Sequence, residues 1–225
     1  MKLKRIPDAC SVVRANPHPG RGTVLVLGTP RGGTSVVAGI CHMLGVSMGL
    51  DIDPSNMEDR GFRALRCDPE RVRKGSEFFR ALKSGNVIAG VKDPALADWI
   101  EECYPLVPEP VLVLVSRDVY ATAQREESSG SALFASLHEV IRRKYKLLEF
   151  VEPLDSPLIV LSYERLLNDP ARAVMSLAQF LVGGVNDELV AHIAKLVRPH
   201  ADMPNELNFV ASRRAYESTQ ALQSA

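Results

Sequence analysis

The chain has 225 residues, which is enough for one sizeable α/β domain and short for two. Its 27 basic and 27 acidic residues balance, so no overall field attracts nucleic acid or an anionic membrane, and any basic site must be local. The four cysteines are widely separated and form no C-x-x-C pair, which argues against a zinc site or a redox dithiol. No apolar run is long enough for a membrane span, and residues 1–8 lack the apolar core of a secretory signal. We therefore expect a soluble, cytoplasmic protein with no stable membrane insertion and no nucleic-acid partner.

Three regions are expected along the chain. Residues 1–22 contain several prolines and glycines and predict a loose leader. Residues 23–211 alternate strand-like apolar runs with helical segments and predict a single α/β domain. Residues 212–225 are polar and predict a tail that forms at most a frayed helix.

The strand candidates are short and almost continuously apolar, which is typical of strands buried on both faces of a parallel sheet. They span residues 23–28, 86–91, 111–115 and 158–162. Helical segments are expected at residues 34–45, 94–103, 131–150 and 170–182. The last has a good start signal, because Asp169 is a favourable N-cap and Pro170 suits the first helical position. This alternation predicts an α/β fold with a three-layer, doubly wound parallel sheet.

A glycine-rich turn at residues 29–35 joins the first strand to the first helix. Such a turn aims backbone N–H groups and the positive helix end at one point, which suits a phosphate or sulfate group. The spacing of Gly28 and Gly33 fits the nucleotide phosphate loop G-x-x-x-x-G-K-[ST], but Thr34 stands where the lysine would be. The nearest cation is Arg31, inside the turn. A turn that only connects two elements is the alternative, because a bare G-x-x-x-x-G is a weak signal.

Positive charge is concentrated just after the strand candidates. In a doubly wound sheet, ligands bind beyond the carboxyl ends of the strands. Arg31, Lys92 and Arg117 each follow one of the first three candidates, and Tyr163 follows the fourth. In a chain whose charges balance overall, this placement predicts a site for a polyanionic small molecule.

Four segments together resemble the sulfotransferases that use 3′-phosphoadenosine 5′-phosphosulfate (PAPS). Residues 30–35 are similar to the family's 5′-phosphosulfate loop, and residues 90–94 to the lysine-bearing strand exit of its bacterial members. Residues 112–123 resemble its 3′-phosphate strand and helix, and residues 162–170 resemble its Tyr-Glu-Asp-Leu segment. The order and spacing agree over roughly residues 23–182. The resemblance implies a P-loop NTPase-like sulfotransferase fold, PAPS as donor, 3′,5′-ADP as product and no metal.

The resemblance also implies roles for individual residues. Arg117 would bind the 3′-phosphate, and Tyr163 would lie near the adenine. Lys92 would neutralise the bridging oxygen as the sulfuryl group leaves, whereas a lysine that lies along the surface is the alternative. The residues expected to hold the 5′-phosphosulfate through a guanidinium, backbone N–H groups and hydroxyls are Pro30, Arg31, Gly32, Gly33, Thr34 and Ser35.

The 3′-phosphate segment departs from the family pattern. Relatives commonly place a serine eight residues after the first arginine, and here that position is Arg125. Either two residues are lost and Thr122 supplies the hydroxyl, or Arg125 supplies a second cation. A solvated Arg125 and a register with Leu114 at the position of the key arginine are further alternatives.

The catalytic base also departs from the pattern. Many relatives use a histidine two residues after the lysine, and here that position is Pro94. Others use a glutamate that follows the phosphate loop, and the acidic residues after this loop include Glu58 and Asp53. These two are the candidates for the group that takes the acceptor's proton, with simple solvation as the alternative for each.

The resemblance implies in-line transfer of a sulfuryl group from PAPS to a hydroxyl or amine, by positioning and charge neutralisation. The acceptor is expected to be a small molecule or a glycan, with lipid, phenol and peptide left open, and residues 46–80 and 198–214 are expected to shape its pocket. A kinase-like phosphotransferase with Ser35 as a magnesium ligand is one alternative. A non-catalytic nucleotide-binding protein on the same fold is another. The oligomeric state, a homo-oligomer included, stays open.

Overall fold

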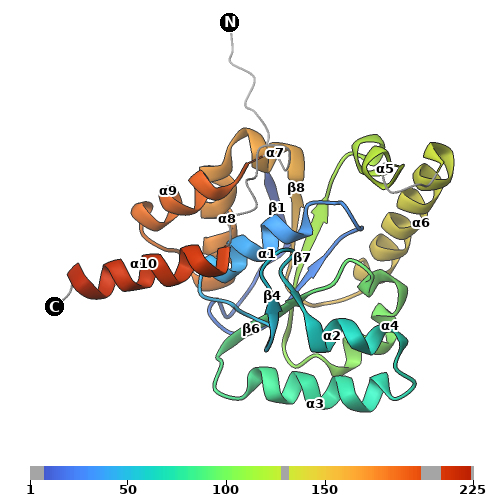
Figure 1. Cartoon of the computed structure of the whole chain (residues 1–225), viewed down its shortest axis with the longest axis horizontal. Coiled ribbons are helices and arrows are strands. Elements are labelled where there is room, and N and C mark those ends of the chain that lie inside the picture. The colour runs from blue at the N-terminus through green and yellow to red at the C-terminus, as the bar shows by residue number, and fades with distance from the viewer. Residues whose placement is uncertain (1–7, 128–131, 199–208, 224–225) are drawn as a thin grey trace, which may run out of the picture.

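The computed structural model describes residues 8–127, 132–198 and 209–223. Its strands are β1 (Cys10–Arg14), β2 (Gly22–Leu27), β3 (Ser47–Met48), β4 (Ile52–Asp53), β5 (Glu58–Asp59), β6 (Ile88–Lys92), β7 (Pro110–Ser116) and β8 (Leu158–Ser162). Six of them form one sheet in the order β1-β8-β7-β2-β6-β3, and β4 pairs with β5 in a separate hairpin (Figure 1).

The predicted parallel sheet is confirmed for its central strands. β2 pairs in parallel with β6 on one side and β7 on the other, β7 continues to β8, and β6 continues to β3. The four strand candidates correspond to β2, β6, β7 and β8, and their ends differ from the predicted ends by no more than two residues. Their carboxyl ends therefore meet at one edge of the sheet, as the site prediction requires.

The edge strand β1 differs from the expectation. Cys10–Arg14 forms a strand antiparallel to β8, within the segment expected to be a loose leader. Its only buried side chain is Cys10, whereas Val12 and Val13 are more than half exposed. Because backbone pairing rather than apolar burial holds this strand, its sequence carries little strand signal.

The helices are α1 (Thr34–Met43), α2 (Arg60–Ala64), α3 (Arg71–Lys83), α4 (Ile100–Cys103), α5 (Val119–Glu127), α6 (Leu133–Val151), α7 (Tyr163–Asn168), α8 (Pro170–Val182), α9 (Asp187–Leu196) and α10 (Phe209–Gln223). Short 3₁₀ turns lie at η1 (Leu65–Cys67), η2 (Leu96–Asp98) and η3 (Tyr104–Leu106). α8 has the predicted bounds, and its N-cap Asp169 accepts a hydrogen bond of 3.2 Å from Arg172 N. The single helix expected at 94–103 is wrong, because Trp99, with φ −137°, separates η2 from α4.

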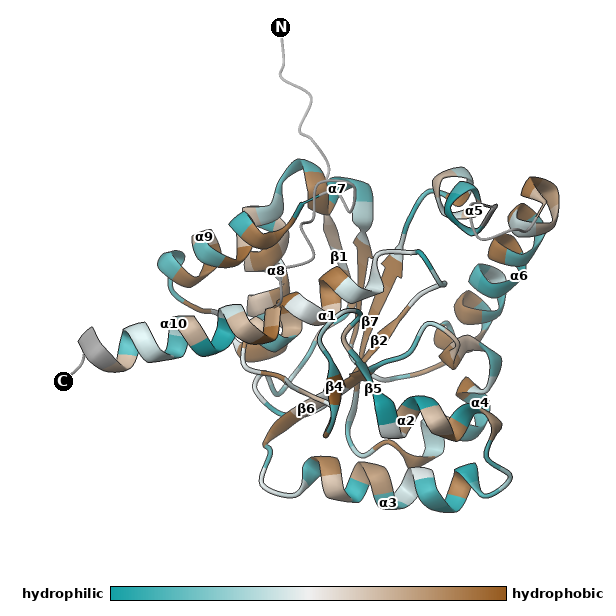
Figure 2. Cartoon of the chain, in the orientation of Figure 1, coloured by the Kyte–Doolittle hydropathy of each residue, from teal (hydrophilic) through white to brown (hydrophobic). Residues whose placement is uncertain are grey.

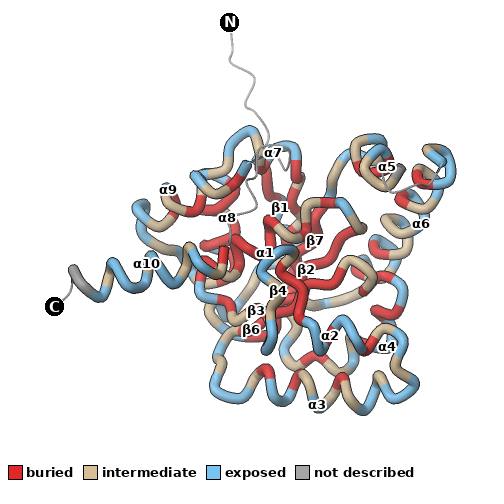
Figure 3. The backbone as a smooth tube through the Cα atoms, viewed as in Figure 1, coloured by how far each residue is buried: buried red, intermediate tan, exposed pale blue. Residues whose placement is uncertain are grey.

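Two hydrophobic cores lie on opposite faces of the sheet. Val24 and Val26 of β2 pack with α1, α8 and α10, whereas the alternate residues Leu25 and Leu27 pack with α3, α4 and α6. The strands are accordingly brown in Figure 2 and mostly red in Figure 3, with polar helix faces turned outward. The three-layer α/β prediction is confirmed.

The expected boundary between domain and tail at residue 211 falls inside α10. Phe209 packs on Gly39 of α1 so closely that a Cβ at that glycine would stand 2.3 Å from the ring. Arg213 Nη1 donates to the His42 carbonyl at 2.8 Å, in addition to the bond that this carbonyl accepts from Gly45 N. α10 is therefore docked on α1, next to the cleft described below. No helix in the described ranges is long and apolar enough to cross a membrane.

Candidate active site

The phosphate loop lies between the carboxyl end of β2 and the N-terminus of α1. Gly28 approaches the start of the helix closely, since a Cβ there would stand 2.7 Å from the Thr34 methyl. Arg31 has φ 57° and the N-cap Gly33 has φ 87°, so two left-handed residues shape the turn. Among the described residues no side chain caps the first turn of α1, and that turn contains no acidic residue. Its N–H groups and the positive helix end therefore suit an anion.

A cleft of about 760 Å³ opens above this loop. Its size falls in the usual range for small-molecule sites. The β4–β5 hairpin, η1 and the start of α10 contribute residues to its other walls. The expected site residues that line it are Pro30, Arg31, Gly33, Thr34, Ser35, Asp53, Glu58, Lys92, Arg125 and Tyr163. The remaining expected residues, Gly32, Arg117 and Thr122, lie outside this lining.

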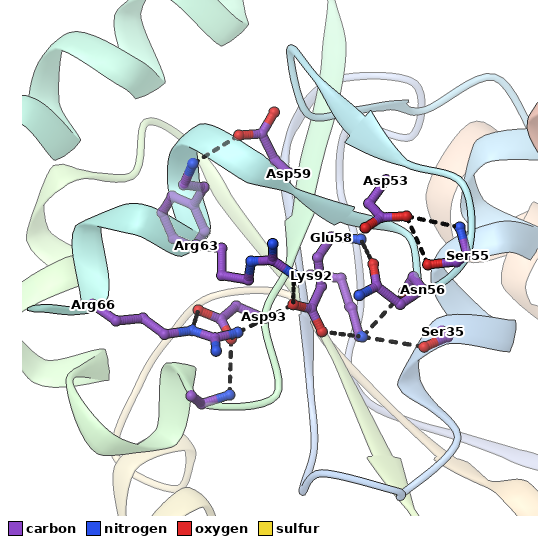
Figure 4. A network of polar contacts seen from close by, with 12 residues as sticks. Ser35, Asp53, Ser55, Asn56, Glu58, Asp59, Arg63, Arg66, Lys92 and Asp93 are labelled. Carbon is purple, nitrogen blue, oxygen red and sulfur yellow. Dashed lines mark hydrogen bonds and ion pairs between the residues drawn. The ribbon is translucent and has the colours of Figure 1, made fainter.

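Lys92 ends β6 and points into the cleft beside the phosphate loop. Its side chain is 2% exposed, and Nζ donates to Ser35 Oγ at 3.1 Å, Asn56 O at 3.1 Å and Glu58 Oε1 at 3.0 Å (Figure 4). Burial lowers the pKa of Lys92 below its ordinary value, and the Glu58 carboxylate opposes that shift. The surface-lysine alternative is wrong.

Glu58 is the acidic residue that shares this position with Lys92. It begins β5, and its side chain is 10% exposed. One carboxylate oxygen accepts from Lys92, and the other accepts from Arg66 Nη2 at 3.2 Å. Its neighbour Asp59 is 3% exposed and caps α2 by accepting from Phe62 N at 2.7 Å. Glu58 therefore stands on a well-anchored segment and opens onto the cleft.

Arg117 and Tyr163 form a stack at the loop. The Arg117 guanidinium lies 5.0 Å from the centroid of the Tyr163 ring, and its Nη1 donates to Arg31 O at 2.7 Å. The ring in turn packs on Gly33, where a Cβ would stand 2.2 Å from Tyr163 Cδ2. Residues from the ends of β2, β7 and β8 are thus in contact at one point.

The two alternatives for the 3′-phosphate segment are placed differently. Thr122 is fully buried, and its hydroxyl donates to Asp118 O at 2.7 Å, inside α5. Arg125 lines the cleft, and burial lowers its pKa, with the nearby charges of Arg117 and Arg31 adding to the effect. Three arginines therefore crowd one region, and a bound polyanion would relieve their repulsion. Of the two residues, Arg125 is the one that lines the cleft.

Asp53 and Glu58 oppose each other across the β4–β5 hairpin. The Asp53 carboxylate, however, accepts from Ser55 N at 3.0 Å and from Ser55 Oγ at 2.7 Å, and these bonds lower its pKa. Asp53 is therefore occupied in holding the hairpin turn, at the rim of the cleft. Of the two acids, Glu58 is the one in contact with Lys92.

Sequence reasoning predicted no individual role for several cleft residues, among them Asn56, Arg66 and Phe209, although all three lie within the segments 46–80 and 198–214 expected to shape the pocket. Arg66 follows α2 and is one of several arginines in a polar stretch, with no motif around it. Phe209 lies within a segment expected to shape the pocket, but nothing in the sequence separates it from its neighbours. Only the tertiary fold brings these residues to the strand ends.

No protein-family model matches the chain, and no curated protein matches its sequence. Solved structures do match. The sulfotransferase domain of the olefin synthase from Synechococcus PCC 7002 aligns with a TM-score of 0.55 and 12% identity, over 91% of this chain and 98% of that one. Retinol dehydratase, solved with retinol and PAP, aligns with a TM-score of 0.51 and 14% identity, over 84% of this chain and 69% of that one. A sulfotransferase domain from the curacin biosynthetic pathway aligns with a TM-score of 0.48 and 14% identity, over 78% of each chain. The chain therefore has the fold of sulfotransferase domains, an α/β fold with a mostly parallel central sheet.

Proposed function

We propose that this protein transfers a sulfuryl group from PAPS to a hydroxyl or amine of a small-molecule acceptor. The observation that carries the proposal is the gathering of Arg31, Arg117 and Arg125 at the uncapped N-terminus of α1, with Lys92 buried beside the same loop. A donor with a 5′-phosphosulfate and a 3′-phosphate matches this distribution of positive charge. Retinol dehydratase was solved with retinol and PAP, and PAP is 3′,5′-ADP, the desulfated form of PAPS. This match supports a small-molecule acceptor and PAPS as the donor.

In this proposal the loop binds the 5′-phosphosulfate. The N–H groups at the start of α1 donate to its oxygens, and Arg31 and the hydroxyls of Thr34 and Ser35 add further donors. Arg117 and Arg125 bind the 3′-phosphate, and Tyr163 lies beside the adenosine. Because Arg117 also donates to Arg31 O, the two phosphate subsites are physically linked.

The proposed chemistry needs a cation at the bond that breaks and a base at the nucleophile. Lys92 stabilises the charge that develops on the bridging oxygen when the bond between that oxygen and sulfur breaks. The acceptor oxygen or nitrogen forms the new bond to sulfur, and Glu58 takes its proton. Lys92 Nζ donates to Glu58 Oε1 at 3.0 Å. When the donor binds, Lys92 transfers this hydrogen bond to the donor, and Glu58 Oε1 becomes able to accept the proton.

A melting experiment tests the donor assignment. A ligand that binds only the folded protein at about 100 times its Kd adds about 2.7 kcal/mol of stability, which for a chain of this size raises Tm by about 5–10 °C. We expect this rise with 3′,5′-ADP and a smaller one with 5′-ADP. Arg31→Ala should abolish the rise, whereas the exposed Arg165 on α7 provides the matched control Arg165→Ala, which should keep it.

Two outcomes would overturn the proposal. No rise with 3′,5′-ADP, together with a rise with ATP and magnesium, would favour a kinase-like phosphotransferase, in which Ser35 contacts the metal. Binding of 3′,5′-ADP without conversion of PAPS to 3′,5′-ADP, with or without a panel of hydroxylated and amine acceptors, would favour a nucleotide-binding protein without catalysis.

A further inference from the structure

Arg66 and Asp93 form an ion pair behind the proposed base. Arg66 lies in η1, and its Nε donates to Asp93 Oδ2 at 2.7 Å while its Nη2 contacts Asp93 Oδ1 (Figure 4). The Asp93 side chain is 1% exposed, and its Oδ1 also accepts from Ala95 N at 2.8 Å. This two-point contact fixes the plane of the guanidinium, because the fork of an arginine matches a carboxylate in only a few geometries.

The same guanidinium extends to Glu58. Arg66 Nη2, which contacts Asp93, also donates to Glu58 Oε2 at 3.2 Å. Glu58 is thus held from two sides, by Lys92 at Oε1 and by Arg66 at Oε2. When Lys92 turns to a donor, Arg66 is the hydrogen-bond donor that continues to hold the carboxylate.

We propose that Arg66 and Asp93 are a positioning pair that sets the orientation and the protonation of the Glu58 carboxylate, an inference that rests on the role proposed for Glu58. Arg66 alone would place an uncompensated positive charge 3.2 Å from Glu58 Oε2. The buried negative charge of Asp93 offsets part of the Arg66 charge. Asp93 thereby holds Arg66, and through it Glu58, in place while reducing the net positive charge beside the carboxylate.

The charges around Glu58 come from its own strand and from neighbouring elements. Ser35 of α1 contributes a neutral hydroxyl that contacts Lys92 and not Glu58 directly. Arg63 of α2 lies 3.8 Å from Glu58 Oε2, beyond hydrogen-bond distance, and its side chain is 44% exposed. The charged residues that face or neighbour Glu58 are Asp53, Asp59, Arg63, Arg66, Lys92 and Asp93.

The pair predicts opposite effects of two variants on the titration of Glu58. The carboxyl carbon of Glu58 can be followed by ¹³C NMR, with its signal identified by its loss in Glu58→Gln. Arg66→Gln removes the positive partner and should raise the midpoint of this titration. Asp93→Asn keeps the shape of the pair but removes its negative charge, and should lower the midpoint. The matched control is Arg63→Gln, which removes an exposed cation near the same oxygen and should move the midpoint less than either.

A second readout is the pH profile of sulfate release from PAPS with water as acceptor. The acid limb of this profile should move to higher pH in Arg66→Gln and to lower pH in Asp93→Asn, and the maximal rate should be lower in both variants. A residue that only stabilises the fold would lower the rate in both variants without moving the limb in opposite directions. Where Arg66→Gln does not fold, Arg66→Lys keeps the charge but loses the two-point contact with Asp93, so it should lower the maximal rate while moving the acid limb less than Asp93→Asn does, and the Asp93→Asn arm stands by itself.

The outcomes separate this inference from the proposed function. Midpoints that move in the same direction, or an unchanged midpoint in a folded Asp93→Asn, would overturn the positioning pair. Binding of 3′,5′-ADP is measured by calorimetry on the same samples. Absence of binding by the wild-type protein would defeat the donor assignment, whereas opposite NMR shifts would still support the pair.

Discussion

Replacing Gly33 by alanine tests whether the phosphate loop depends on contact between its backbone and the Tyr163 ring. Gly33 has φ 87°, where a Cβ costs about 1 kcal/mol. That Cβ would stand 2.2 Å from Tyr163 Cδ2, and the ring is held under Arg117 and 4% exposed, so it must be displaced. Overpacking of this kind adds about 1–3 kcal/mol, which gives a total destabilisation of about 2–4 kcal/mol. Gly45 is the matched control, since it has φ 99° and nothing lies within 4 Å of an added Cβ.

Thermal unfolding of the two variants measures the difference. For a chain of this size, 1 kcal/mol corresponds to about 2–4 °C, so Gly33→Ala should melt about 5 °C below Gly45→Ala. Calorimetry should show that Gly33→Ala loses most of its affinity for 3′,5′-ADP, because the displaced ring carries Arg117 away from the loop, whereas Gly45→Ala binds normally. Equal melting temperatures and equal affinities would show that the ring does not shape the loop.

Three further outcomes are expected. Arg117→Gln should weaken binding of 3′,5′-ADP by about tenfold or more, because a charge-assisted contact to the 3′-phosphate is lost, and should weaken binding of 5′-ADP by much less. Calorimetry measures both affinities, and an equal loss for the two ligands would contradict this role of Arg117. Lys92→Met should slow sulfate release from PAPS by a factor of about 10² to 10³ while leaving 3′,5′-ADP binding nearly intact, and an unchanged rate would exclude Lys92 from the chemistry. Burial, reinforced by the Arg213 charge, lowers the pKa of His42 from 6.5 to about 4. Between these two pH values the folded protein binds fewer protons than the unfolded chain, so its stability falls as the pH drops from about 6.5 towards 4. His42→Gln should remove about 1–2 kcal/mol of this loss of stability at acid pH, a figure reduced for solvent screening of the partly exposed ring. Melting curves between about pH 7 and 4 should then show a smaller change of Tm with pH than the wild type shows. An unchanged dependence of Tm on pH would contradict the burial of a neutral ring.

The strand exits could be predicted from the sequence because the central strands are buried on both faces. Continuous apolar runs such as residues 111–115 have few other structural explanations, and once the sheet is parallel its carboxyl ends must lie together. Arg31, Lys92 and Tyr163, each placed after a strand candidate, line one cleft, whereas Arg117 contacts Arg31 O from outside that lining. β1 could not be predicted in this way, because an exposed edge strand needs no apolar pattern.

The part of the site that faces the loop could not be predicted, because it depends on tertiary packing. Arg66 reaches Asp93 across 27 positions of the chain, and its place follows from Phe62, whose ring packs among the aromatic side chains of α3. A buried aromatic residue on a five-residue helix leaves no periodic signal in the sequence. The choice between Thr122 and Arg125 also depends on the tertiary fold. The two residues lie less than one helical turn apart on α5, yet Thr122 faces the buried side of the helix and Arg125 faces the cleft.

The phosphate loop has Thr34 at the lysine position of the motif, but Lys92 of β6 places an ammonium group beside the same loop. β6 lies beside β2 in a register that pairs Lys92 with Val26, so the side chain that ends β6 emerges next to the loop that follows β2. Its Nζ reaches Ser35 Oγ, across 57 positions of the chain. A cation on the loop moves when the loop moves, whereas a cation at the end of a central strand is fixed by the sheet. Such a lysine can bind a loop-held anion and a carboxylate on the opposite wall in turn, and Lys92 contacts both Ser35 and Glu58. The departure from the phosphate-loop motif therefore places a single cation in contact with both the phosphate loop, at Ser35, and the acid on the other side of the cleft, Glu58.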